Sequence, residues 1–315
     1  MDKQETLALC EQFQIRPTKS LGQNFLIQES VSRRIAALAD LSSSDLVIEI
    51  GPGLGALTVE LAASAGKVIA IEIDRHLIPA LQFKMSQFAN ATIIHEDALK
   101  TNLRQLTDGW TGPVKLAANL PYYITTPLIE KMIVELPHSA AMILMLQEEA
   151  ADRLLAKPGS KLYSPLAILA AQYGRGAKAF SVPASAYMPQ PHVDSCVVTL
   201  TASRSQTSQA GQPITAGQPT AASQPTAFDQ PATTSQISQA GQPPINSPRY
   251  QRFLETCFAQ RRKTLLNNLR TVGLTIEQMQ DVRSFLAERG LAESVRAEAV
   301  GAIDFAALFQ ICSTT

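Results

Sequence analysis

The chain has 315 residues, 45% of them hydrophobic and 17% charged, which is typical of a folded globular protein. Its 27 basic and 27 acidic residues cancel, so the net charge gives no indication of a nucleic-acid partner. No stretch approaches about 18 uninterrupted apolar residues, and no basic segment followed by a long apolar core opens the chain, so we expect neither a membrane span nor a signal peptide.

The four cysteines are far apart and form no metal-ligand pair, which favours reduced thiols and a cytoplasmic protein without a metal site. They are Cys10, Cys196, Cys257 and Cys312.

Apolar runs alternate with helical patterns over the first 201 residues. The runs lie at residues 46–50, 67–73, 91–95, 114–118 and 141–146. Continuous apolar strands separated by helices are typical of a parallel sheet that is covered on both faces. Two later runs, 177–182 and 196–201, are joined by a short connection, so at least one of them should be antiparallel.

Residues 202–248 have a different composition. The sequence SQAGQP occurs twice, and Arg204 and Asp229 are the only charged residues. Such a segment buries too little apolar surface to offset its chain entropy, so we predict a disordered linker between a catalytic domain (1–201) and a small all-α domain (249–315). A flexible linker of this length reaches roughly 35–40 Å, which would let the helical domain move widely unless it packs on the rest.

Glycines follow the first strand, in the segment Gly51–Pro–Gly–Leu–Gly55, and let the backbone approach a ligand closely. Glu72 ends the second strand about twenty residues later, where an acid can accept hydrogen bonds from ribose hydroxyls. Both features suit NAD as well as S-adenosylmethionine. For Asp74, two residues further on, we expect a helix N-cap role instead.

The third strand ends in His95, Glu96 and Asp97. A metal site here is unfavourable, because consecutive side chains at a strand end point in alternating directions. An acid at this position can instead meet the exocyclic amine of an adenine.

The end of the fourth strand distinguishes between NAD and S-adenosylmethionine as the cofactor. This strand runs into Asn119, Leu120, Pro121, Tyr122 and Tyr123. An adenine amine is a poor nucleophile, since its lone pair is delocalised into the ring. The Asn119 side-chain oxygen and the Leu120 carbonyl can each accept one of its hydrogens, and an aromatic ring can stack on the base. We expect Tyr122 to supply that ring and Tyr123 to pack toward the following helix. A dehydrogenase would leave this turn unexplained.

Several blocks closely resemble the ribosomal RNA adenine dimethyltransferases, specifically the group that acts on the small subunit. They are PTKSLGQNFL, VIEIGPGLGALT, VIAIEID, HEDAL, NLPYYITTPL, MLQEEAADRLLAKPGSKLYSPL, VPASAYMPQPHVDS and FAQRRKTLLNNL. The resemblance implies a class I S-adenosylmethionine-dependent methyltransferase fold, Rossmann-like with a mostly parallel seven-stranded sheet, and a small helical C-terminal domain. The implied activity is dimethylation of N6 of two adjacent adenosines in the loop of the 3′-terminal hairpin of small-subunit (16S-type) rRNA.

The resemblance also assigns site residues. The implied cofactor contacts are Asn24, Leu26, Gly51, Glu72, Asp97 and Asn119. Without it, the segment GQNFL would read as the start of a helix with Phe25 and Leu26 in the core. Tyr122 matches the stacking aromatic, and Tyr187 stands where the family usually has phenylalanine. Tyr187 either forms a second wall for the base or packs on the sheet. Tyr123 departs from the asparagine that is common in the family.

A basic cluster in FAQRRKTLLNNL, namely Arg261, Arg262 and Lys263, lies in a stretch with a local charge of +5 between residues 249 and 270. With Lys19, these residues are expected to contact rRNA phosphates of the small ribosomal subunit. We expect a monomer that takes part in small-subunit biogenesis. The alternatives are a large-subunit rRNA adenine methyltransferase and an assembly factor that acts mainly by binding.

Overall fold

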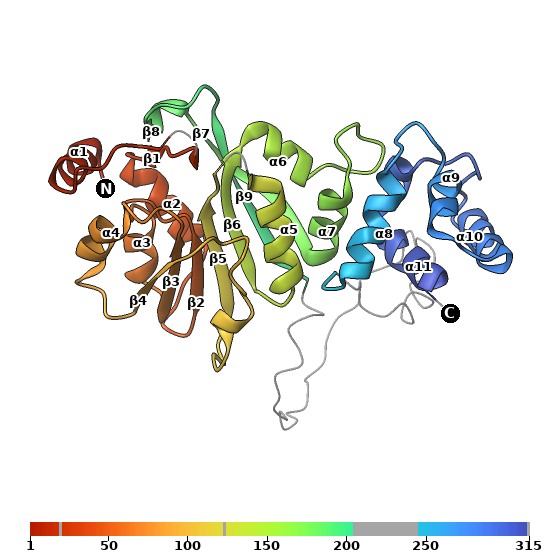
Figure 1. Ribbon diagram of the computed structural model, residues 1–315, viewed down its shortest axis with the longest axis horizontal. Helices are drawn as coiled ribbons and strands as arrows, with labels where there is room; N and C mark the ends of the chain where they lie inside the picture. The colour runs from red at the N-terminus through yellow and green to blue at the C-terminus, as the bar shows by residue number, and fades with distance from the viewer. Residues whose placement is uncertain (19–20, 122–123, 204–244, 314–315) are drawn as a thin grey trace, which may run out of the picture.

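The computed structural model describes residues 1–18, 21–121, 124–203 and 245–313. A seven-stranded sheet forms its centre, with the strand order β4-β3-β2-β5-β6-β9-β7 (Figure 1). The strands are β2 (Leu46–Ile50), β3 (Lys67–Glu72), β4 (Ala91–His95), β5 (Val114–Asn119), β6 (Ala141–Gln147), β7 (Gly174–Val182) and β9 (Ser195–Ala202). A separate two-stranded sheet joins β1 (Phe25–Leu26) to β8 (Tyr187–Met188).

Strands β4, β3, β2, β5 and β6 pair in parallel, and β9 is antiparallel to both of its neighbours, β6 and β7. The predicted mostly parallel sheet is therefore confirmed, as is the antiparallel strand inferred from the short connection. The α-helices described before residue 204 are α1 (Lys3–Gln12), α2 (Glu29–Leu38), α3 (Thr58–Ala62), α4 (Ile78–Met85), α5 (Thr125–Glu135), α6 (Glu148–Leu154) and α7 (Pro165–Tyr173).

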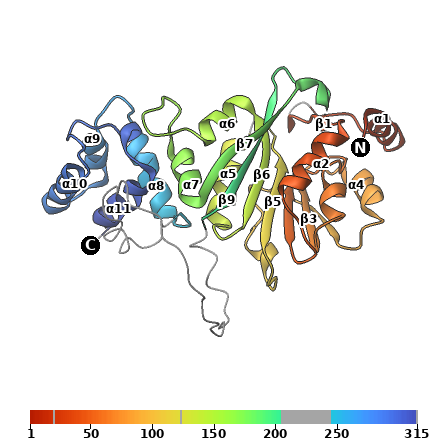
Figure 2. The same cartoon turned by 180° about the vertical axis from the view of Figure 1, so that it is seen from behind.

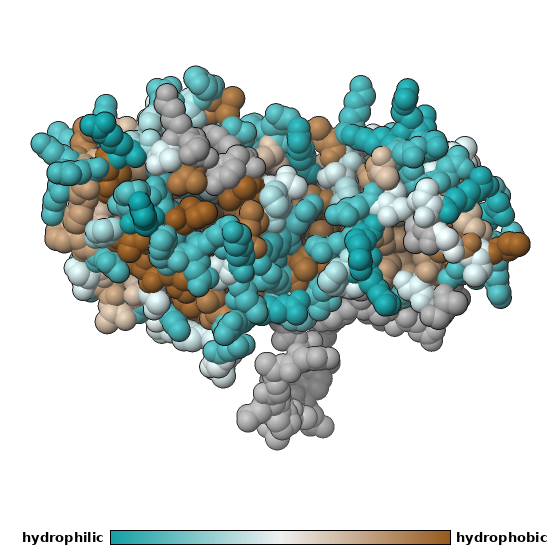
Figure 3. Space-filling model, in the orientation of Figure 1, coloured by the Kyte–Doolittle hydropathy of each residue, from teal (hydrophilic) through white to brown (hydrophobic). Residues whose placement is uncertain are grey.

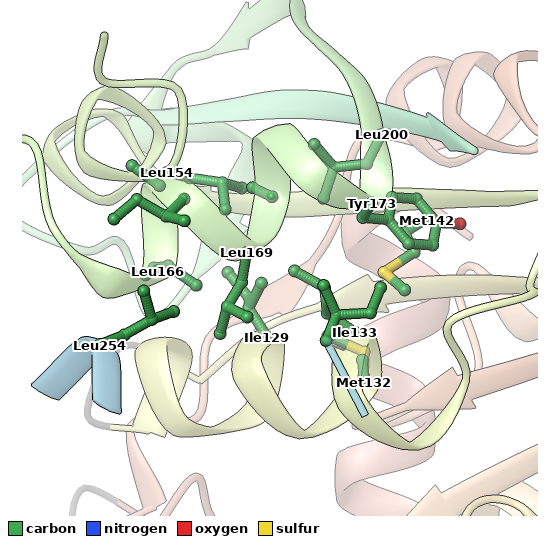
Figure 4. Packing of buried hydrophobic residues seen from close by; sticks show 14 of the residues in the cluster. Ile129, Met132, Ile133, Met142, Leu154, Leu166, Leu169, Tyr173, Leu200 and Leu254 are labelled. Carbon is green, nitrogen blue, oxygen red and sulfur yellow. The ribbon is translucent and has the colours of Figure 1, made fainter. Parts of the chain in front are cut away.

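The inner strands β2, β3, β5, β6 and β9 are largely buried on both faces, as their continuous apolar runs predict, whereas the edge strands β4 and β7 are more exposed. Neighbouring residues of one strand belong to different hydrophobic clusters, because successive side chains point to opposite faces. Ile48 and Leu116 pack with α5 and α7, whereas Val47 and Ala117 pack with α2, α3 and α4. Figure 1 shows α5 and α7 on the near face, and Figure 2 shows α2 on the other. In Figure 4, Ile129 of α5 faces Leu169 of α7.

The C-terminal part is helical, as expected, and packs directly on the sheet domain. Its helices are α8 (Pro248–Phe258), α9 (Leu265–Leu269), α10 (Ile276–Glu288) and α11 (Ala302–Ser313). Leu254 of α8 lies beside Leu166 of α7 in one continuous core (Figure 4). The Gln172 side-chain amide donates to the Tyr250 hydroxyl at 2.5 Å and to the Ala302 carbonyl at 2.7 Å.

This packing limits the wide motion that a free linker would allow. The predicted linker, 202–248, falls almost entirely outside the described residues, so its disorder and the domain boundaries stay predictions. Within the described ranges, no helix has both the length and the apolar character needed to cross a bilayer.

Candidate active site

A cavity opens at the carboxyl ends of β2, β3 and β5, the edge where open α/β sheets bind their ligands. About 770 Å³ of space free of protein atoms lies in this cavity, with the open solvent at its mouth included. Seven of the residues singled out from the sequence line it together: Asn24, Leu26, Gly51, Glu72, Asn119, Leu120 and Tyr187.

The glycine loop after β2 forms the floor of this cavity. Gly51 has φ of +71° and Gly53 has φ of +59°, values that strongly favour glycine. A Cβ on Gly51 would lie 3.6 Å from the Asn119 carbonyl oxygen, and one on Gly53 would lie 3.5 Å from the Phe25 ring. The loop is thus held close to both the end of β5 and the N-terminal segment, and its backbone is open to a ligand.

Glu72, the last residue of β3, is 4% exposed and firmly held. One carboxylate oxygen accepts from the Gly53 N–H at 3.0 Å, and the other accepts from the Asp74 N–H at 2.9 Å. Burial raises the pKa of Glu72 above its ordinary value, the two hydrogen bonds oppose this, and the charge of Asp74 adds to it. The carboxylate is therefore positioned before any ligand arrives.

Asp74 does not have the N-cap role expected from the sequence. The N-cap of α4 is Leu77, which makes no side-chain capping bond. Asp74 instead accepts the His76 N–H at 2.9 Å within a turn that precedes the helix. Its other oxygen accepts from the side chains of Gln23 at 2.7 Å and Thr18 at 3.4 Å. These partners lie more than fifty positions away in sequence, so no local pattern could predict them.

Glu49 also lines the cavity, although the sequence reading did not single it out. It lies in β2, is 1% exposed, and its Oε2 has no hydrogen-bond partner within the described part of the chain. The pKa of Glu49 is raised to about 8: burial is the largest cause, the Thr58 hydroxyl opposes it, and the charge of Glu72 adds to it. The available signal was an acid inside the otherwise apolar run LVIEI.

The turn after β5 carries the residues predicted for catalysis. The Leu120 N–H donates to the Met145 carbonyl at 2.9 Å, and the Thr125 hydroxyl donates to the Pro121 carbonyl at 3.0 Å. These bonds fix the exit from the strand. Among the described residues, the Asn119 side-chain amide has no hydrogen-bond partner, so it is available to a ligand in the cavity.

The segment GQNFL does not begin a helix, so that sequence interpretation is wrong. Phe25 and Leu26 form strand β1, which pairs antiparallel with Met188 and Tyr187 of β8, and α2 starts only at Glu29. Both residues are buried, as expected. This pairing brings Tyr187, which is 3% exposed, to the cavity wall, so it both packs in the core and faces the site.

Three of the singled-out residues, Lys19, Tyr122 and Tyr123, lie outside the described residues, so their roles stay predictions. Asp97 is described but does not line the cavity. It follows β4, where its carboxylate accepts the Leu99 N–H at 2.9 Å. The adjoining Glu96 N–H donates to the Glu72 carbonyl at 3.0 Å, so this strand end lies next to the site.

Three of the four predicted RNA-binding residues, Arg261, Arg262 and Lys263, follow α8, and all three are exposed. Arg261 already has partners: its guanidinium donates to the Lys161 carbonyl at 2.6 Å and pairs with Glu298 at 3.2 Å. It therefore ties the loop before α7 to the helical part. Arg262 and Lys263 have no ion pair with another described residue. On the face shown in Figure 3, hydrophilic residues cover most of the helical part, and the larger hydrophobic surface lies over the sheet domain.

Comparisons with known proteins agree with this geometry. A family profile described as "Ribosomal RNA adenine dimethylase" matches residues 14–213. Proteins named ribosomal RNA small subunit methyltransferase A from Levilactobacillus brevis and Magnetococcus marinus are 36% and 38% identical to this chain. Each alignment covers 95% of this chain, and 91% and 93% of the two relatives.

Solved structures share the fold. A dimethyladenosine transferase from Plasmodium falciparum has a TM-score of 0.64 and 26% identity, over 90% of this chain and 95% of its own. The 23S rRNA methyltransferase ErmE has a TM-score of 0.60 at 22% identity, over 92% of this chain and 100% of its own. The predicted class I methyltransferase fold is thereby confirmed, and the chain belongs to the ribosomal RNA adenine dimethylase family.

Proposed function

We propose that this enzyme transfers methyl groups from S-adenosylmethionine to N6 of two adjacent adenosines in the loop of the 3′-terminal hairpin of small-subunit rRNA, and that it takes part in small-subunit biogenesis. One observation carries the proposal: the Asn119 amide, which has no hydrogen-bond partner among the described residues, and the buried Glu72 carboxylate line a single cavity. The names of the most similar relatives favour the small subunit over the large-subunit alternative.

The residues present fit S-adenosylmethionine, which supplies an electrophilic methyl group when it is bound. Glu72 is fixed by two backbone donors at a strand end, where it can accept the ribose hydroxyls. Gly51 leaves its backbone open to close approach, and Asn24 and Leu26 close the cavity from the N-terminal side. Asp97, beside the end of β3, is the proposed partner of the adenine amine.

The target adenine must leave its stack to enter such a cavity. We assign Asn119 and the Leu120 carbonyl to the two hydrogens of its amine, which favours a pyramidal nitrogen with its lone pair free to attack. No strong base is needed, because the amine becomes acidic once it is alkylated. Tyr187 is the proposed wall of the base site, and Tyr122 its stacking partner by resemblance.

For the substrate RNA, Arg262 and Lys263 are the proposed phosphate contacts, with Lys19 and Arg261 as further candidates. The whole small subunit or its rRNA is the proposed partner. We further propose that the enzyme acts as a monomer in the cytoplasm, where this substrate is assembled. Light scattering of the purified protein tests whether it is a monomer in solution.

The decisive experiment uses labelled S-adenosylmethionine, unmethylated small subunits and mapping of the modified bases. Asn119→Ala should lower turnover by at least about 100-fold, the usual effect of removing one preorganised polar contact from a reacting group. Cofactor binding should remain measurable by calorimetry. Asn102→Ala, at an exposed asparagine that does not line the cavity, is the matched control. Near-normal turnover of Asn119→Ala, or methylation at other bases, would contradict the proposal.

A further inference from the structure

The Gln23 side chain bridges two parts of the chain beside the cavity. Its carbonyl oxygen accepts the Thr18 N–H at 2.7 Å, and its amide nitrogen donates to Asp74 Oδ2 at 2.7 Å. A short hydrogen bond to a carboxylate is stronger than one between neutral groups. Gln23 immediately precedes Asn24, so this bond fixes one end of the segment that carries the proposed cofactor contact.

Asp74 is itself held rigidly on the sheet side. It is 6% exposed, its N–H donates to Glu72 Oε1 at 2.9 Å, and its Oδ1 accepts the His76 N–H at 2.9 Å. The same short stretch after β3 therefore positions the Glu72 carboxylate through its backbone and Gln23 through its side chain.

The other end of the segment is fixed by β-pairing. Phe25 and Leu26 pair with Met188 and Tyr187, and both are buried. Asn24 thus lies between two anchors, and its side-chain amide donates to the Gly22 carbonyl at 3.0 Å. With either anchor released, cofactor binding would have to order residues 22–26, which costs affinity.

We propose that Asp74 is a positioning residue for the cofactor site: through Gln23 it holds the Gly22–Leu26 segment at a fixed place relative to Glu72. This inference rests on the proposed function, because it assumes that Asn24, Leu26 and Glu72 contact the same cofactor. Asp74 need not touch the cofactor itself, since its oxygens are committed to Gln23, Thr18 and His76.

The test reverses the hydrogen bond. Gln23→Glu places two carboxylates against each other, and combining it with Asp74→Asn restores one donor and one acceptor. Amide hydrogen exchange of residues 21–26 in the free protein shows directly whether the hydrogen bond between Gln23 and Asp74 holds this segment in place. Calorimetry with S-adenosylmethionine reports its effect on the cofactor. Gln12→Glu, on the exposed side of α1, is the matched control.

We expect Gln23→Glu to speed exchange and to weaken S-adenosylmethionine binding at least about tenfold, because a hydrogen bond to a charged group changes an equilibrium constant by more than that. The double variant should return both values to within about threefold of the parent protein. In methylation assays, KM for S-adenosylmethionine should rise in Gln23→Glu with kcat nearly unchanged.

Parent-like exchange or parent-like binding in Gln23→Glu would overturn the proposal, as would a double variant that stays as impaired as the single one. A parent protein that binds no S-adenosylmethionine would refute the proposed function instead. In that case the exchange of residues 21–26 still decides whether Asp74 anchors the segment.

Discussion

Glu49→Gln is expected to change how the stability of this protein depends on pH, because Glu49 is buried in β2 without a full set of hydrogen bonds. The residue is 1% exposed, and none of the residues that the structure describes forms a hydrogen bond with its Oε2. Burial raises its pKa from 4.5 to about 8, so its carboxyl group is mostly protonated at neutral pH. Glutamine has nearly the same shape and is neutral at every pH, so it mimics the protonated side chain.

The direction and the size of this pH dependence of stability follow from proton linkage. Between pH 4.5 and about 8 the folded protein holds a proton on Glu49 that the unfolded chain has lost, so the stability due to this group falls as pH rises through that window. Each pKa unit corresponds to about 1.4 kcal/mol, so the whole loss is roughly 3–5 kcal/mol. Below pH 4.5 both states are protonated and the contribution is constant.

Urea unfolding followed between pH 5 and 9 measures this effect. The parent protein and Glu49→Gln should be similarly stable near pH 5, and the variant should be the more stable of the two at pH 9. Glu288→Gln, an exposed glutamate near the end of α10, is the control and should leave the difference between pH 5 and 9 unchanged. Parallel pH profiles for the parent and Glu49→Gln would show that Glu49 is already ionised in the folded protein, and would refute the reasoning.

Two further predictions concern the helical part. Neutralising Arg262 and Lys263 to glutamine should weaken binding to the small subunit and lower the slope of log affinity against log salt by about 1–2; an unchanged slope would exclude phosphate contact. Leu254→Ala, at a fully buried position where α8 meets α7, should lower the free energy of unfolding, measured with urea, by about 2–5 kcal/mol. Leu7→Ala, at an exposed leucine, should cost far less, and an equal loss would mean that the α8 contact contributes little.

Local patterns in the sequence were enough to predict the sheet and many of the residues that line the cavity. Continuous apolar runs predicted the strands, and the acid at the end of β3 and the Asn–Leu–Pro turn after β5 marked the site. These signals succeed because each is contained in a few consecutive residues. The carboxyl ends of parallel strands then meet at one edge, which brings Glu72 and Asn119 to the same cavity.

Only the tertiary structure shows which contacts join the segments that are far apart in the sequence. Gln23 and Asp74 are 51 positions apart, and Gln172 and Tyr250 are 78 apart. Neither contact has a periodicity or a motif, since a single hydrogen bond leaves no repeat in the chain. For the same reason the local pattern of GQNFL predicts a helix start, whereas pairing with the distant β8 makes Phe25 and Leu26 a strand. The raised pKa of Glu49 likewise depends on burial by neighbours from distant segments. The sequence shows that an acid stands at this position, but only the fold determines that it is protonated.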